Sequence, residues 1–97
     1  MFTTPQILAM LKDFRTRRGE EFGIEKLGLF GSCARGEQKE QSDIDICIKV
    51  NKGGLMFFYG VKMELEKLFN RKIDLISLGA TLLPLFKKEL ERDAIYV

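Results

Sequence analysis

Three aspartates and a glycine–serine pair are the residues of this sequence whose types and spacing could perform chemistry. Asp43 and Asp45 lie one residue apart in the stretch SDIDI, and Asp74 lies in a second apolar stretch, KIDLISL. Carboxylate oxygens suit magnesium, a hard divalent cation. Two such ions held close together favour in-line displacement at phosphorus, because they neutralise the attacking and the leaving oxygens. If the fold gathers these aspartates, they predict a two-magnesium catalytic centre.

Clustered carboxylates are costly without a cation. Two of them about 5 Å apart repel by ~3 kcal/mol at an effective dielectric of about 20. A bound divalent ion offsets this repulsion, so the cluster favours a metal site. Taken singly, Asp43 and Asp45 could mark a solvent-facing strand edge, and Asp74 could be a surface charge or one half of an ion pair.

The stretch GSCARG predicts a binding turn for phosphate. Gly31 lets the backbone approach an anion closely, and the amides that open a following helix point toward it. Ser32 can add a hydroxyl hydrogen bond, and Arg35, one helical turn further on, can face the same polyphosphate. Two alternatives stay open: a plain strand-to-helix turn, and an Arg35 that pairs with Glu37 or Glu40.

The elements that must position these residues follow from apolar periodicity and turn residues. Thr4 and Pro5 predict an N-cap and a first helical residue. Period-two stretches predict strands, and apolar residues at helical spacing predict helices. The predicted helices cover residues 4–21, 32–36, 55–69 and about 84–93; the predicted strands cover 24–31, 43–50 and 72–78; residues 94–97 are predicted as a short tail.

This alternation of helices and strands predicts one sheet with helices packed against it, in a single α/β domain over residues 1–97. Because strand side chains alternate, Asp43, Asp45 and Cys47 should share one face of their strand. The isoleucines between them should share the other. The aspartates and the Gly31 turn then converge if their strands are neighbours.

Composition excludes several classes of chemistry. The 97 residues include no histidine, which removes Ser-His and Cys-His pairs and histidine zinc sites. A net charge of +2 gives no argument for nucleic acid or an anionic membrane as a partner. No apolar segment approaches the ~20 residues that span a bilayer. Two cysteines, Cys33 and Cys47, are expected as free packing thiols in a cytoplasmic protein.

The stretch LMFFYG, residues 55–60, is more apolar than one helical face can bury in so small a domain. Phe58, and with it Leu55, is expected in the core. Met56, Phe57 and Tyr59 are candidates for a partner surface.

GSCARG followed by SDIDI resembles the G-S-x-x-x-G…S-D-I-D signature of the DNA polymerase β-like nucleotidyltransferase superfamily. The longer stretch LFGSCARGEQKEQSDIDICI is especially similar to the minimal nucleotidyltransferase (MNT) group, the MntA-type proteins. The similarity extends to KIDLIS and to Ile95-Tyr96, and so covers essentially the whole chain. Many members carry a basic residue directly after Gly-Ser, where this chain has Cys33.

The resemblance implies a palm-like α/β (α+β) fold with a small mixed sheet of three or four strands. It implies Asp43, Asp45 and Asp74 as catalytic metal ligands for Mg²⁺, and Gly31 and Ser32 as nucleotide-phosphate ligands. Ser42 of the same signature is grouped with them, against the alternative that its hydroxyl bonds local backbone where the strand begins.

The implied activity is transfer of a nucleoside monophosphate, AMP from ATP, to an acceptor hydroxyl. MNT proteins commonly act as antitoxins on a HEPN-type toxin, so a tyrosine of such a partner is the expected acceptor. Two alternatives are a non-catalytic antitoxin that neutralises its partner by occlusion and a transferase for a small molecule such as an aminoglycoside. Nucleic acid is not expected as a direct substrate.

Overall fold

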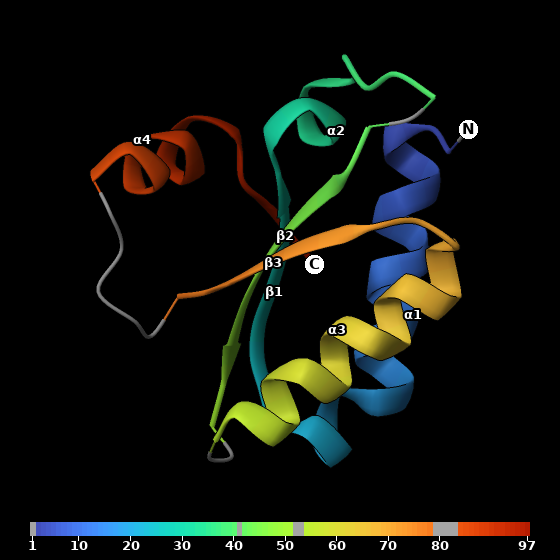
Figure 1. The fold of residues 1–97 in the computed structure, drawn as a ribbon, viewed down its shortest axis with the longest axis vertical. Helices are drawn as coiled ribbons and strands as arrows, with labels where there is room; N and C mark the ends of the chain where they lie inside the picture. Colours follow the sequence, from blue (N-terminus) through green and yellow to red (C-terminus); the bar gives the residue numbers. More distant parts are fainter. Residues whose placement is uncertain (1, 41, 52–53, 79–83) are drawn as a thin grey trace.

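The structure is a computed structural model that describes residues 2–40, 42–51, 54–78 and 84–97 (Figure 1). Within these residues, four helices alternate with four strands. Their bounds are α1 Thr4–Phe22, β1 Ile24–Phe30, α2 Gly31–Arg35, β2 Ile44–Val50, α3 Leu55–Phe69, β3 Ile73–Ser77, α4 Pro84–Asp93 and β4 Ile95–Tyr96. This order confirms the predicted α/β class.

The sheet is mixed, with strand order β3-β2-β1-β4. β1 pairs antiparallel with β2 and with β4, whereas β2 and β3 run parallel. The prediction that residues 94–97 form only a tail is wrong, because Ile95 and Tyr96 pair with Leu29 and Gly28. A strand of two residues is too short to show a period-two pattern, so only the tertiary pairing reveals it.

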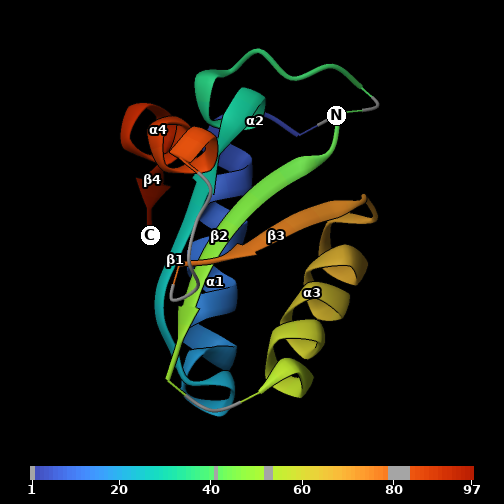
Figure 2. The same cartoon turned by 60° about the vertical axis from the view of Figure 1, so that its left-hand side comes forward.

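Helices cover both faces of the sheet. Ile44, Ile46 and Ile48 of β2 share one buried cluster with residues of α1 and α3. On the opposite face, Cys47 of β2 packs with Phe30 and with Leu90 of α4. Figures 1 and 2 show α1 and α3 on one side of the sheet and α4 on the other. The alternation predicted for β2 therefore separates the main core from the face that carries Asp45.

The first helix is capped one residue earlier than predicted. Thr3, not Thr4, is the N-cap: its hydroxyl accepts from the Gln6 amide at 3.3 Å, and the Gln6 side chain accepts from the Thr3 amide at 2.8 Å. This reciprocal pair is a capping box. Thr4 instead donates its hydroxyl to the Cys33 carbonyl at 2.6 Å, which links α1 to α2.

Helix α3 has the predicted bounds, and Phe58 packs against the core as predicted, whereas Leu55 does not. The side chains that it buries fully are Val61, Leu65 and Phe69. Phe57 and Phe58 pack partly buried against the same core, whereas Leu55 is 71% exposed. Leu55 is therefore not a core residue, because it lies at the solvent end of the first turn. Met56 and Tyr59 are exposed, and their use as a partner surface stays a prediction.

Both cysteines are buried free thiols, as predicted. Burial raises the pKa of the Cys33 and Cys47 thiols, which keeps them protonated and unreactive near neutral pH. None of the helices in the described part of the chain combines the length and the apolar character needed to cross a lipid bilayer.

Candidate active site

Asp45 and Asp74 lie side by side on neighbouring strands. The parallel register of β2 and β3 places Asp45 opposite Asp74, and the antiparallel register of β1 and β2 places Phe30 opposite Asp45. Residues paired in this way point to the same face of a sheet. We call Asp45 and Asp74 the acidic row. They lie beside Phe30, on the face of the sheet that α4 covers in part.

The acidic row is electrostatically strained. The pKa of Asp45 is raised to about 6, first by burial, then by the Asp74 charge and a hydrogen bond with Asp74, and further by the charges of Asp43 and Glu89. Among the described residues, neither Asp45 nor Asp74 has a lysine or arginine within ion-pair distance. Within the described part of the chain the two carboxylates thus lack a direct ion-pair partner, which is the condition that a divalent cation would relieve.

Asp43 lies just before β2 and is paired with Lys72. Its Oδ2 is 3.8 Å from Nζ of Lys72, in a partly exposed ion pair. Across the described residues, no group of three acidic or sulfur side chains is already arranged to hold one metal ion. The structure therefore brings Asp45 and Asp74 together, whereas Asp43 is paired with Lys72. An exposed pair of this length is weak.

Gly31 places the predicted phosphate turn directly against the acidic row. Its φ of +72° is a left-handed conformation, and a Cβ there would lie 2.2 Å from Oδ2 of Asp45. The left-handed backbone favours glycine, and a Cβ at this position would force the Asp45 carboxylate to move. Ser32 follows, half-buried, in the first turn of α2. A polyphosphate bound by this turn would therefore lie next to the Asp45 carboxylate.

Arg35 does not face the turn. Its Nε donates to Oε2 of Glu37 at 3.0 Å and its NH1 donates to Oδ2 of Asp93 at 2.6 Å. The Glu37 pairing that the sequence left open as an alternative is confirmed. Nε and NH1 of Arg35 are thus engaged by carboxylates rather than directed to the Gly31 turn.

Within the described part of the chain, Ser42 makes only local hydrogen bonds. Its hydroxyl accepts from the Lys39 amide at 2.8 Å, and its own amide donates to the Lys39 carbonyl at 3.0 Å. These bonds close a turn at the start of β2, which supports the local role over nucleotide binding.

A cavity of about 340 Å³ opens beside the acidic row. Two of its residues could not be assigned from the sequence: Lys62 of α3 and Glu89 of α4. Each stands in a helix on ordinary helical spacing, and only the packing of these helices on the sheet brings them to the aspartates. The full lining is Phe30, Asp45, Lys62, Asp74, Leu75, Ile76 and Glu89.

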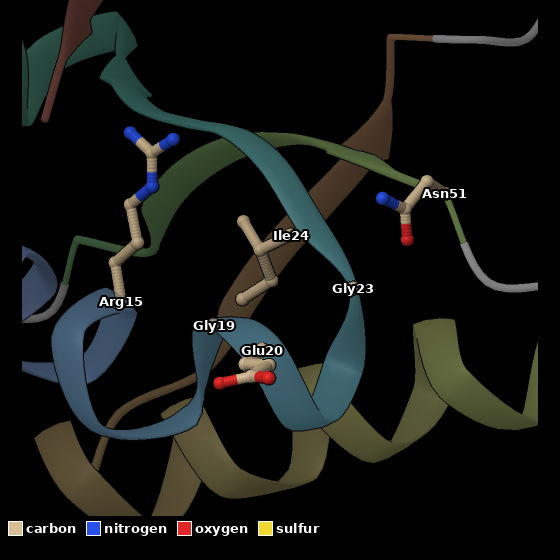
Figure 3. Close-up of a pocket in the computed structure, with 6 residues that line it drawn as sticks. All are labelled: Arg15, Gly19, Glu20, Gly23, Ile24 and Asn51. Atoms are coloured by element: carbon tan, nitrogen blue, oxygen red, sulfur yellow. The ribbon is translucent and has the colours of Figure 1, made fainter.

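A larger hollow, of about 460 Å³, lies at the other end of the sheet (Figure 3). It is lined by Arg15, Gly19, Glu20, Gly23, Ile24 and Asn51. Ile24 pairs with Val50, at the far ends of β1 and β2 from Phe30 and Asp45. The Arg15 guanidinium already donates to the carbonyls of Glu25 and Val97. This hollow is thus separate from the acidic row, and we assign it no chemistry.

Known proteins of the same size resemble this chain in sequence. A candidate protein adenylyltransferase of Methanocaldococcus jannaschii is 37% identical over 100 residues, with both chains covered in full. Protein adenylyltransferase MntA of Thermococcus cleftensis is 33% identical over 98 residues, which cover this whole chain and 98% of that relative.

Solved structures resemble the chain over nearly its whole length. The structure of a candidate minimal nucleotidyltransferase matches with a TM-score of 0.78 at 28% identity, covering 97% of this chain and 95% of that chain. A complex of a tri-AMPylated HEPN toxin of Shewanella oneidensis with its MNT antitoxin matches with a TM-score of 0.58 at 16% identity, covering 96% of this chain and 66% of that chain. The second likeness shows a shared fold.

The family assignment rests on the sequence as a whole and agrees with the site geometry. Residues 11–97 match the family model of the nucleotidyltransferase domain, a span that includes the Gly31 turn and the acidic row. The two relatives, which are more than 30% identical and align over nearly their full length, are named as protein adenylyltransferases. The chain therefore belongs to the nucleotidyltransferase domain family, and it is a nucleotidyltransferase.

Proposed function

We propose that this nucleotidyltransferase moves AMP from ATP to a hydroxyl of a partner protein, and that the partner is a HEPN-type toxin which the transfer neutralises. The observation that carries the proposal is the Asp45–Asp74 pair next to the Gly31 turn. The names of the full-length relatives, protein adenylyltransferases, support a protein acceptor. The complex of an AMPylated HEPN toxin with its MNT antitoxin supports the kind of partner.

The chain's residues divide the reaction between them. Gly31 and Ser32 bind the triphosphate and direct its α-phosphorus toward Asp45. Asp43, Asp45 and Asp74 would hold Mg²⁺, as two ions, which when bound neutralises charge on the attacking and leaving oxygens. Asp74 orients the acceptor hydroxyl and takes its proton. The acceptor oxygen bonds to the α-phosphorus as the bond to pyrophosphate breaks, and pyrophosphate leaves.

The cavity beside the row supports an acceptor brought by another molecule. At about 340 Å³ it lies at the lower end of the ~300–1,000 Å³ typical of small-molecule pockets. Phe30, Leu75 and Ile76 give it an apolar wall, and the acidic row closes one side. That combination suits a tyrosine side chain, with its ring against the wall and its hydroxyl at Asp74.

Neutralisation by occlusion alone is the second candidate. The observation in its favour is that Asp43 pairs with Lys72, which leaves the described residues without a ready set of three ligands. In that case the fold would bind its partner without transferring a nucleotide. Two buried free thiols fit the reducing cytoplasm under either candidate.

The test is label transfer to a candidate HEPN-type toxin partner. The protein is incubated with α-labelled ATP, Mg²⁺ and that partner, and the label on each chain is measured. We expect label on the partner with the wild type and with Asp13→Asn, an exposed acidic control in α1. We expect none with Asp45→Asn combined with Asp74→Asn. If that double variant still neutralises the toxin fully without labelling it, occlusion replaces transfer.

A further inference from the structure

We propose that Asp93 of α4 is a positioning residue for the nucleotide, acting through Arg35 to fix α2 and the Gly31–Ser32 turn at its N-terminus. The inference rests on the proposed function, since it assumes that the turn binds a nucleotide triphosphate. The proposal gives α4 a role in the reaction. The sequence does not reveal this role, because α4 lies far along the chain from the Gly-Ser pair.

Asp93 is a buried charge with two cationic partners. Its carboxylate side chain is 3% exposed and accepts from NH1 of Arg35 at 2.6 Å. It also accepts two bonds from its neighbour Arg92, both at 2.9 Å. Burying a carboxylate is costly unless it is paired and hydrogen-bonded, so this geometry is strongly specified. Asp93 is the one charged residue that is buried in the described part of the chain.

Helix α2 depends on such outside contacts for its position. It has five residues, and its first turn receives no side-chain cap. A helix this short is not stable by itself, because forming its first turn fixes several residues for one hydrogen bond. Three hydrogen bonds tie it to residues more distant along the chain: the Thr4 hydroxyl donates to the Cys33 carbonyl, the Cys33 thiol donates to the Asp43 carbonyl at 3.7 Å, and Arg35 donates to Asp93. The Cys33 side chain is also buried in the main core. Loss of the Asp93 bond would remove the ion pair that ties α2 to α4.

The position of α2 matters because the turn touches the acidic row. A Cβ on Gly31 would lie 2.2 Å from Oδ2 of Asp45, so small shifts of this backbone change the space between turn and carboxylate. Misplacing a binding group by about 1 Å can cost on the order of 100-fold in catalysis. The same α4 that holds Arg35 also carries Glu89, one turn before Asp93, into the cavity beside the row. One ion pair therefore couples the phosphate turn and the cavity wall.

The test compares Arg35→Gln, Asp93→Asn and their double variant with the wild type, using Mg²⁺ and a non-hydrolysable ATP analogue. We expect each single change to weaken analogue binding about tenfold and to speed amide exchange in residues 31–36. We expect the double variant to bind no worse than either single one, because the two residues act as a unit. Arg17→Gln, which breaks an exposed ion pair with Asp13 at 2.8 Å in α1, is the matched control.

The outcomes separate this inference from the proposed function. If the wild type binds no Mg-nucleotide, the proposed function fails. If the wild type binds and the Arg35 and Asp93 variants bind equally well, the positioning role is overturned. It is also overturned if these variants lower the urea midpoint but leave analogue affinity and local exchange unchanged. Should Asp93→Asn fail to fold, Arg35→Lys takes its place, because lysine keeps the charge but loses the forked geometry of the guanidinium. Weaker analogue binding by Arg35→Lys supports the positioning role, and unchanged binding overturns it.

Discussion

At the scale of single residues, Asp45 is held where its ionised form is disfavoured. Its pKa of about 6 lies above the ordinary 3.8 for an aspartate. The folded state therefore binds the proton more tightly than the unfolded chain. Stability from this group is fully present below about pH 4 and is lost as the pH rises toward 6. Such strain is typical of sites that stabilise charge on a ligand.

Replacing Asp45 by asparagine should therefore stabilise the protein while removing activity. The shift corresponds to at most about 3 kcal/mol, and solvent screening lowers this, so we expect a gain of about 1–2 kcal/mol at pH 7.5 in the presence of a chelator. At pH 4 the gain should vanish. Urea denaturation at the two pH values measures it, with Asp13→Asn as the control. A loss of stability at pH 7.5 would show that the Asp45 charge is compensated in the fold.

Gly31 offers a second test, with a matched control in Gly36, which follows the last residue of α2. Gly31 and Gly36 share a φ of +72°, but the nearest atom to a Cβ is 2.2 Å away at Gly31 and 3.8 Å away at Gly36. Alanine at either position costs about 1–2 kcal/mol of backbone strain. Gly31→Ala should cost at least 1 kcal/mol more by urea denaturation and should abolish binding of the Mg²⁺–ATP analogue. Equal costs would mean that the turn can move away from Asp45.

At the scale of elements, the sequence predicts the features that depend on neighbouring residues alone. The bounds of α3 and the two faces of β2 follow from helical and period-two spacing. β4 and the approach of Lys62 and Glu89 to the aspartates did not follow, because these depend on how distant elements pack. The predicted N-cap is off by one residue. Threonine is a common N-cap residue and stands at both positions 3 and 4, and only the hydrogen bond from the Gln6 amide identifies Thr3 as the cap.

The position of β4 depends on Gly28 having no side chain. Gly28 lies between Cys47 of β2 and Tyr96 of β4, and a Cβ there would be 2.9 Å from Cδ1 of Tyr96 and 3.0 Å from Sγ of Cys47. Gly28→Ala should therefore destabilise the protein by about 1–3 kcal/mol, because the Tyr96 ring must move. Adding Tyr96→Ala should recover part of that loss. Thermal unfolding of the single and double variants checks this, and additive losses would argue against the contact.

At the scale of the whole molecule, two carboxylates give stability opposite dependences on pH. The bonds from Arg92 and Arg35 lower the pKa of Asp93, so its contribution is present above the ordinary aspartate pKa and is lost as the pH falls through the lowered value. Asp45 acts in the other sense between about pH 4 and 6. From these two groups, stability should rise as the pH falls from 7 to about 4 and then decline.

The variants separate the two limbs of this profile. Asp93→Asn should weaken the decline below about pH 4, and Asp45→Asn should remove the rise between 7 and 4. Urea midpoints across the pH range, measured with chelator present, provide the check. A wild-type midpoint that falls steadily from pH 7 downward would contradict the assignment of Asp45.

Binding of Mg-ATP measured by calorimetry tests the central assignment most directly. The acidic row beside the Gly31 turn predicts saturable heat with the wild type at millimolar ligand or below, and dependence of that heat on Mg²⁺. Asp74→Asn should weaken binding at least about 100-fold, because it removes half of the preformed carboxylate pair. Asp13→Asn should match the wild type. Equal binding by Asp74→Asn and the wild type would show that the nucleotide site lies elsewhere.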